Sequence, residues 1–208
     1  MKKLLTLALT AILLLGCAQT GHAEFRWGPT LGMTYNHPRF KQILFPTQDK
    51  MGFAAGVTGE NIFPGIGIGM TLGLEYQMRT HGLDLGDREI WASQGLGHVD
   101  LRMSYIAIPI HLRWKWTRLN GLEEKIAPFI YGGPTIGFMV GHSQLKPFTF
   151  AHGDVNLDCG FGLELFRRLQ ISGGYSFGMT YAYKAKILTN FSARTNFWTV
   201  RVAYFFKD

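Results

Sequence analysis

The sequence predicts an all-β protein, an eight-stranded antiparallel up-and-down transmembrane β-barrel with short periplasmic turns and longer outer loops. Three observations predict this class. Apolar and polar residues alternate over unusually long segments, small residues dominate the polar positions, and aromatic residues gather near the segment ends. The composition agrees, since 47% of the 208 residues are hydrophobic and only 17% are charged, whereas soluble domains carry about 25% charged residues.

The clearest alternation covers residues 66–79. Apolar side chains occupy every second position from Ile66 to Met78, and the positions between them hold Gly, Thr, Glu and Gln. A period of two sends one face of a strand to an apolar medium and the other face to a small polar space. The same pattern, at different strengths, predicts eight strands, over residues 26–36, 51–61, 66–79, 99–116, 126–141, 154–166, 168–183 and 194–206.

The connections between these predicted strands alternate in length. Short links at 62–65, 117–125 and 166–167 separate longer links at 37–50, 80–98, 142–153 and 184–193. Outer-membrane barrels have this rhythm, because their periplasmic turns are short and their outer loops are long. Both ends of the barrel chain are then expected on the periplasmic side.

Alternation alone does not say which face points outward, because a soluble lipocalin-like barrel is also two-faced. The polar face decides between the two barrels. A face in contact with water would carry many Lys and Glu, whereas Gly, Thr, Ser, Ala and Asn predominate here. With the apolar face in lipid, aromatic residues form two girdles, comprising Trp27, Trp114, Trp116, Tyr204 and Phe206 at the periplasmic rim and Tyr35, Tyr76, Tyr181 and Tyr183 at the outer rim.

The N-terminal segment has the features of an export signal, in which Lys2 and Lys3 precede an apolar run too short to span a bilayer. The sequence is compatible with two alternative processing sites. Residues 1–23 form a signal peptide before a barrel domain over 24–208, or residues 1–16 form a lipoprotein signal after which Cys17 would be lipidated. Loss of Lys2 and Lys3 lowers the formal charge from +7 to +5, with 19 basic against 14 acidic residues. No basic run marks a nucleic-acid partner.

Four segments resemble strands of the PorT-type outer-membrane β-barrel family. Residues 105–113 are similar to its Y-x-x-I-P-L-x-L-K strand, and residues 128–137 are similar to its P-Y-x-x-A-G-P-x-x-G strand. Residues 154–164 and 174–180 are similar to its D-x-G-x-x-x-G-x-G-x-E and R-Y-x-x-G-L-T segments. The resemblance implies an eight-stranded outer-membrane barrel. Because a few relatives are tied to type IX secretion, it also implies an accessory role in protein secretion.

The predicted inward face carries ionisable side chains that we expect to pair inside the barrel. A lumen of eight strands holds little besides its own side chains, and an unpaired buried charge is costly. We therefore expect a plugged barrel rather than a general porin. The expected lumen network is Glu75, His111, Arg113, Lys115, Asp158, Glu164 and Arg201.

The sequence shows no recognisable catalytic or metal-binding constellation, so we expect no cofactor and assign no catalytic residue. His142 and Ser143 are adjacent, but successive strand residues point to opposite faces. The outer loops contain His and Asp residues, which can bind metal ions, but these residues show no fixed ligand spacing. Only the composition of the loops therefore favours a metal site there. The loop residues concerned are His37, His81, His98, His142, His152, Asp84, Asp87, Asp100 and Asp154.

These observations favour a structural or interaction protein that binds an envelope partner through its extracellular loops. It is expected to be monomeric, and to meet outer-membrane lipid, lipopolysaccharide and the barrel assembly machinery. Two alternatives stay open at this stage. One is a hydrolase or acyltransferase that modifies lipopolysaccharide, and the other is a small-solute channel.

Overall fold

The computed structural model describes residues 24–40, 47–63, 67–84, 97–117, 125–143, 148–185 and 192–206. The expected signal segment, Cys17 and Asp87 lie outside these residues. No helix in the described ranges has the length and apolar character needed to cross a bilayer. The strands are β1 (Glu24–Phe40), β2 (Thr47–Ile62), β3 (Ile68–Asp84), β4 (His98–Lys115), β5 (Ile126–His142), β6 (Phe148–Phe150), β7 (Gly153–Leu165), β8 (Leu169–Gly178), β9 (Tyr183–Ala185) and β10 (Ser192–Tyr204).

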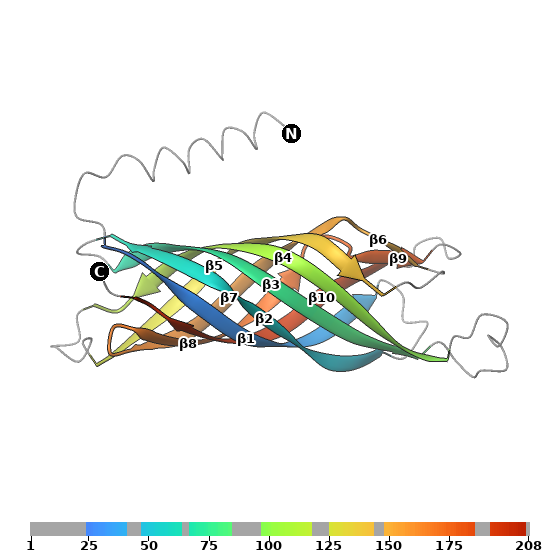
Figure 1. The fold of residues 1–208 in the computed structure, drawn as a ribbon, viewed down its shortest axis with the longest axis horizontal. Coiled ribbons are helices and arrows are strands. Elements are labelled where there is room, and N and C mark those ends of the chain that lie inside the picture. Colours follow the sequence, from blue (N-terminus) through green and yellow to red (C-terminus); the bar gives the residue numbers. More distant parts are fainter. Residues whose placement is uncertain are drawn as a thin grey trace, which may run out of the picture.

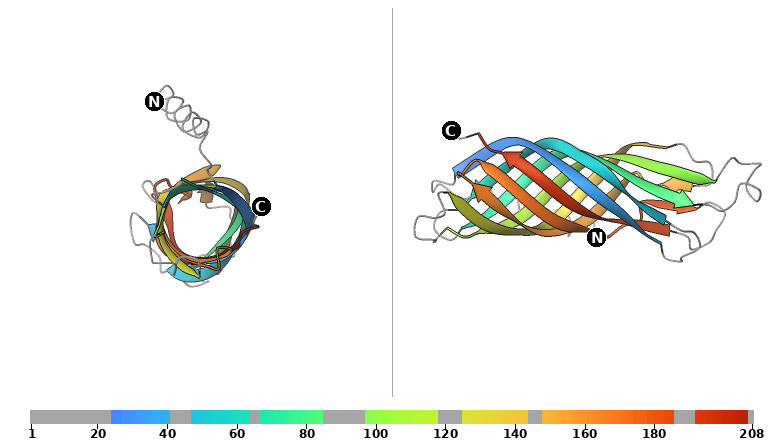
Figure 2. Two further views of the ribbon diagram at one scale, coloured as in Figure 1. Left: turned by 90° about the vertical axis from the view of Figure 1, so that its left-hand side faces the viewer. Right: turned by 90° about the horizontal axis from the view of Figure 1, so that it is seen from below.

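Eight of these strands close into an antiparallel barrel, which confirms the predicted fold class. They follow the order β1-β2-β3-β4-β5-β7-β8-β10, and β10 pairs back with β1 from Thr30↔Ala203 to Phe40↔Ala193. The view along the axis shows the closed ring (Figure 2). Closure satisfies the backbone hydrogen-bonding groups, which lipid itself cannot do.

The short strands β6 and β9 lie at the end of the barrel opposite to the start of β1 (Figure 1). β9 pairs with β10 through Tyr183↔Ala193, and β6 pairs with β9 through Phe150↔Tyr183. β6 and β9 therefore continue β7 and β8 after a break in each strand. The break before β9, at residues 179–182, also interrupts the alternation of side chains.

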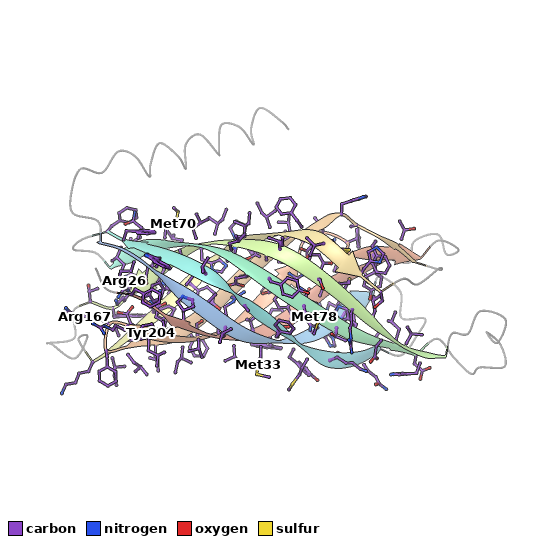
Figure 3. The ribbon with its side chains drawn as sticks, viewed as in Figure 1. Arg26, Met33, Met70, Met78, Arg167 and Tyr204 are labelled. Atoms are coloured by element: carbon purple, nitrogen blue, oxygen red, sulfur yellow. The ribbon has the colours of Figure 1, made fainter. Side chains whose placement is uncertain are left out.

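The outside of the barrel is apolar and the inside is polar. Leu112 is 63% exposed and Phe161 is 72% exposed, whereas Glu75 and Asn156 are buried inside. Side chains such as Met33 project from the outer wall all round the barrel (Figure 3). This pattern is the reverse of a soluble barrel and is the one that a lipid-facing wall requires.

The strands run further at the outer end than the sequence predicts. β1 stays paired with β10 as far as Phe40, and β3 stays paired with β4 up to Asp84↔His98. The expected loops 37–50 and 80–98 are therefore partly strand. The outward positions become polar in this region, so the alternation that marks a lipid-facing strand is lost from the sequence. We call residues 36–40, 47–50, 77–84, 98–105 and 192–197, which lie beyond the outer aromatic residues Tyr35, Tyr76 and Trp198, the outer extension.

Candidate functional site

The first cluster of lumen charges lies near the periplasmic end and centres on Arg26 of β1. Arg26 Nη2 lies 2.8 Å from Glu164 Oε2 and 2.9 Å from Glu60 Oε2. Arg26 Nη1 donates to the carbonyl oxygen of Arg167 at 2.6 Å, in the turn between β7 and β8. Lys115 also pairs with Glu164. Arg26 and Arg167 are seen near the same end of the barrel (Figure 3).

Arg113 and Gln170 complete this periplasmic cluster. Arg113 Nη1 lies 2.9 Å from Glu60 Oε1 and donates to Gln170 Oε1 at 2.6 Å. Gln170 Nε2 in turn donates to Glu60 at 2.8 Å and to Glu164 at 2.7 Å. The Arg113 guanidinium lies 4.1 Å from the centre of the Phe129 ring. Arg113, Glu60 and Gln170 lie on β4, β2 and β8, which are not neighbours in the sheet, so the contacts among these three side chains cross the lumen.

The middle of the lumen holds a second, more open set of polar groups. Arg201 Nη2 lies 3.4 Å from Glu75 Oε2, and His111 Nε2 lies 3.1 Å from Asp158 Oδ2. The same Asp158 oxygen accepts a hydrogen bond from Thr135 at 2.7 Å. A cavity of about 40 Å³ borders Glu75, His111 and Arg201. That volume holds about three water molecules.

Above the cavity, Arg79 pairs with Asp154 across the lumen. The guanidinium also donates to Gln77 Oε1 at 2.8 Å. It lies between two aromatic rings, 4.5 Å from the centre of Tyr105 and 4.4 Å from that of Phe197. A cation between two rings gains from both and is shielded from water.

Part of the inward face in the outer extension is apolar. Tyr183 reaches into this region from β9 and is only 1% exposed. These apolar side chains pack against one another inside the outer end of the barrel. We call this group the outer cluster, and it consists of Leu83, Leu101, Met103, Tyr105, Ala182, Tyr183 and Ala193.

The buried charges of the lumen balance one another when His is neutral. Pairing on this scale offsets the desolvation that an isolated buried charge would suffer. Among the described residues, the buried lumen charges are five cations, Arg26, Arg79, Arg113, Lys115 and Arg201, and five carboxylates, Glu60, Glu75, Asp154, Asp158 and Glu164.

The structure places all seven residues of the expected lumen network inside the barrel, in two separate clusters rather than one. Four further charged residues were missed: Arg26, Glu60, Arg79 and Asp154. Arg26, Glu60 and Arg79 occupy inward positions at or next to the ends of the predicted strands 26–36, 51–61 and 66–79, where few flanking residues show the alternation. Asp154 was assigned to an outer loop, although it faces the lumen from β7.

The aromatic residues expected at the periplasmic rim lie on the outer wall. Trp27 contacts Phe206 with 5.1 Å between ring centres, and Trp114 contacts Trp116 at 4.5 Å. At the outer rim, Tyr35 and Tyr76 are exposed. The placement of Tyr183 in that girdle is wrong, because the break at residues 179–182 turns its side chain inward.

The outer His and Asp residues are not all in loops, which corrects the expectation. His37 lies in β1 with Nδ1 2.8 Å from Asp49 Oδ1, and His81 lies fully buried in β3. Lys50 pairs with Asp100 on the outer surface, and this hydrogen bond lowers the pKa of the Asp100 carboxyl. Among the described residues, no three His, Cys, Asp or Glu side chains are grouped to hold a metal ion.

The adjacent His142 and Ser143 do not form a nucleophile and base pair. His142 Nδ1 lies 3.1 Å from the backbone oxygen of Ser143, and the Ser143 hydroxyl accepts a hydrogen bond from the backbone N–H of Arg102 at 3.1 Å. The imidazole therefore faces a carbonyl group rather than the hydroxyl that it would need to activate.

Residues 17–183 match the family model described as outer membrane protein beta-barrel domain. The chain belongs to this family. It is an outer-membrane β-barrel protein, and its large apolar outer wall is the surface that such a location requires. No curated protein matches the sequence.

Solved structures of three outer-membrane proteins are similar to this member of the family. OprG from Pseudomonas aeruginosa has a TM-score of 0.56 at 10% identity, covering 89% of this chain and 97% of that chain. Ail of Yersinia pestis, solved with the heparin analogue sucrose octasulfate, has a TM-score of 0.46 at 14% identity, covering 88% and 99%. Neisserial surface protein A has a TM-score of 0.42 at 10% identity, covering 86% and 97%. The likeness to OprG concerns the fold.

Proposed function

We propose that this protein is a non-conducting barrel that holds a binding surface for another envelope component above the outer membrane. The observation that carries the proposal is the double closure of the lumen. Arg26 and its partners fill the periplasmic end, and the outer cluster around Tyr183 fills the outer end. A barrel closed in this way supports a surface well and transmits solutes poorly.

The outer extension supplies the binding surface. Its outward side chains are polar and partly tied to one another, as in the pairs His37–Asp49 and Lys50–Asp100. The first pair joins the neighbouring strands β1 and β2, and the second reaches from β2 to β4, so these side chains are held in a defined arrangement at the edge of the membrane. The partner surface then consists of this polar wall together with the connecting loops.

The resemblance to the PorT-type barrels supports a narrower version of the proposal, in which the partner belongs to a protein secretion system. Such an accessory would have to hold its partner without opening a pore of its own. A packed lumen suits that role, because a scaffold gains from rigidity and an open channel would leak.

Two measurements test the proposal. In planar bilayers, the wild-type protein is expected to give no steady single-channel openings, and openings of porin size would contradict a packed lumen. In detergent-solubilised envelopes, the protein is expected to co-purify with a stable partner. A Lys50→Ala and Asp100→Ala double variant should lose that partner, whereas the lipid-facing control Val200→Ala should retain it.

A further inference from the structure

Two arginines face each other at the outer end of the barrel seam, where the first strand meets the last. Arg39 of β1 and Arg194 of β10 are direct cross-strand partners, and both side chains are exposed. Directly opposed side chains on antiparallel strands have Cβ atoms only about 5 Å apart. Like charges at that separation destabilise the strand pair. The sequence has therefore placed a repulsive contact on the seam that closes the barrel.

In the part of the chain that the structure describes, no carboxylate relieves this repulsion. Among the residues that the structure describes, neither Arg39 nor Arg194 has an acidic partner within ion-pair distance. Asp49 on the adjacent strand is engaged by His37 at 2.8 Å. The Arg194 guanidinium lies over the Tyr181 ring at 4.9 Å from its centre. The pair thus offers two exposed cationic side chains side by side.

The height of the pair on the barrel shows what surrounds it. The outward positions along the seam run from Tyr35↔Trp198 through His37↔Asn196 to Arg39↔Arg194. With about 3.3 Å per residue and a strand tilt near 40°, the arginines lie roughly 10 Å beyond the outer aromatic pair. Aromatic side chains of this kind mark the edge of the hydrocarbon core. Arg39 and Arg194 therefore reach the layer of lipid headgroups.

We propose that Arg39 and Arg194 together bind a phosphate group of an outer-leaflet glycolipid, and that this phosphate clamps the first strand of the barrel to the last. A guanidinium presents paired N–H donors that match two oxygens of a phosphate. One phosphate between two guanidiniums replaces a repulsion with two attractions. The proposal goes beyond the partner surface above, because its ligand is a lipid and its consequence is the stability of the seam.

The test compares Arg39→Gln and Arg194→Gln with the control Arg102→Gln, which removes one exposed outward charge away from the seam. The measurements are the thermal midpoint and the binding of bisphosphorylated lipid A to the full chain. In zwitterionic micelles without phosphate-bearing glycolipid, the seam variants should have an unchanged or slightly higher midpoint, because a repulsion is removed. With lipid A, the wild type and Arg102→Gln should gain several degrees and the seam variants much less.

Each seam variant should bind lipid A about tenfold more weakly, as expected for the loss of one charge-assisted contact. The double variant should lose less than the sum of the two, since both side chains hold the same phosphate. Arg39→Lys keeps the positive charge but lacks the paired N–H donors of a guanidinium, so its affinity for lipid A should fall between those of Arg39→Gln and the wild type. An intermediate affinity would also show that the loss in Arg39→Gln is not caused by misfolding.

Two ligand controls decide the source of the phosphate. Lipid A from which the phosphates have been removed should not stabilise the seam, and inorganic phosphate at the same concentration should have little effect. Equal stabilisation by dephosphorylated lipid A would overturn the proposal in favour of acyl-chain contacts. Equal stabilisation by inorganic phosphate, or an equal response of Arg102→Gln and the seam variants, would also overturn it.

Discussion

Arg26 Nη2 lies 2.8 Å from Glu164 Oε2 inside the periplasmic end of the barrel. The two residues belong to β1 and β7, which do not pair in the sheet, so the contact crosses the lumen. Arg26 also holds Glu60 and the backbone oxygen of Arg167. One side chain therefore links two buried carboxylates and a periplasmic turn.

Arg26→Met is expected to destabilise the protein by about 3–5 kcal/mol, because it leaves Glu60 and Glu164 with less compensation in a buried site. Urea unfolding in detergent micelles measures the change. The control Lys125→Gln removes an exposed cation near the same end and should change the free energy of unfolding by less than about 0.5 kcal/mol. Equal stability of Arg26→Met and Lys125→Gln would show that the lumen network contributes nothing.

Two glycines on adjacent strands give a matched pair of alanine substitutions. A Cβ on Gly162 would lie 2.7 Å from the backbone oxygen of Ile171 and even closer to the Phe129 ring, whereas a Cβ on Gly132 would lie 3.5 Å from its nearest neighbour. Gly162→Ala should therefore cost about 1–3 kcal/mol by displacing Phe129. Gly132→Ala should be neutral or slightly stabilising. Unfolding curves of both variants check the difference, and equal effects would refute it.

The turn between β7 and β8 holds two residues in the left-handed region, Phe166 with φ 53° and Arg167 with φ 59°. Side chains with a Cβ pay about 1–2 kcal/mol there, and Asn-Gly suits such hairpin turns. Phe166→Asn combined with Arg167→Gly should raise the free energy of unfolding by about 1–2 kcal/mol. The bond from Arg26 to the backbone oxygen at position 167 is retained. A loss of stability would show that the exposed Phe166 side chain stabilises the protein by more than the strain of its backbone destabilises it.

The buried side chain of His81 should make the stability of the protein depend on pH. Its ring is fully buried in the outer extension, and neither ring nitrogen has a hydrogen-bond partner among the described residues. Burial, with smaller effects from Arg79 and His37, lowers the pKa of the imidazole from 6.5 to about 3. Below pH 6.5 the unfolded chain therefore takes up a proton that the folded chain excludes, so stability is present above pH 6.5 and is lost as the pH falls toward 3.

Between pH 6.5 and pH 5 this difference should cost the wild type about 2 kcal/mol. A His81→Leu variant should lack that part of the pH dependence. Urea unfolding at the two pH values measures it, and hydrogen exchange at the outer ends of β3 and β4 locates it. An unchanged slope in His81→Leu would assign the pH dependence to other groups.

The membrane-facing part of the barrel could be read from the sequence because lipid imposes a simple rule on it. Every second residue from Ile68 to Met78 must be apolar, and the residues between them must fit a narrow lumen, so one periodic pattern reveals both the strand and its orientation. The same reasoning does not identify the strands of the outer extension. Its strands meet water outside and an apolar cluster inside, and the polar signal at Arg39 or Lys50 is the same as that of a loop.

The sequence alone determined the fold class, the orientation of the faces and the seven ionisable residues of the lumen, since these depend on the local period of two. Which charges meet, as with Arg26 and Glu164, and where the pattern breaks, as at Tyr183, follow from the folded barrel. Contacts across the lumen depend on strand tilt and register around the closed ring. Those quantities belong to the whole barrel, and no single segment of the chain encodes them.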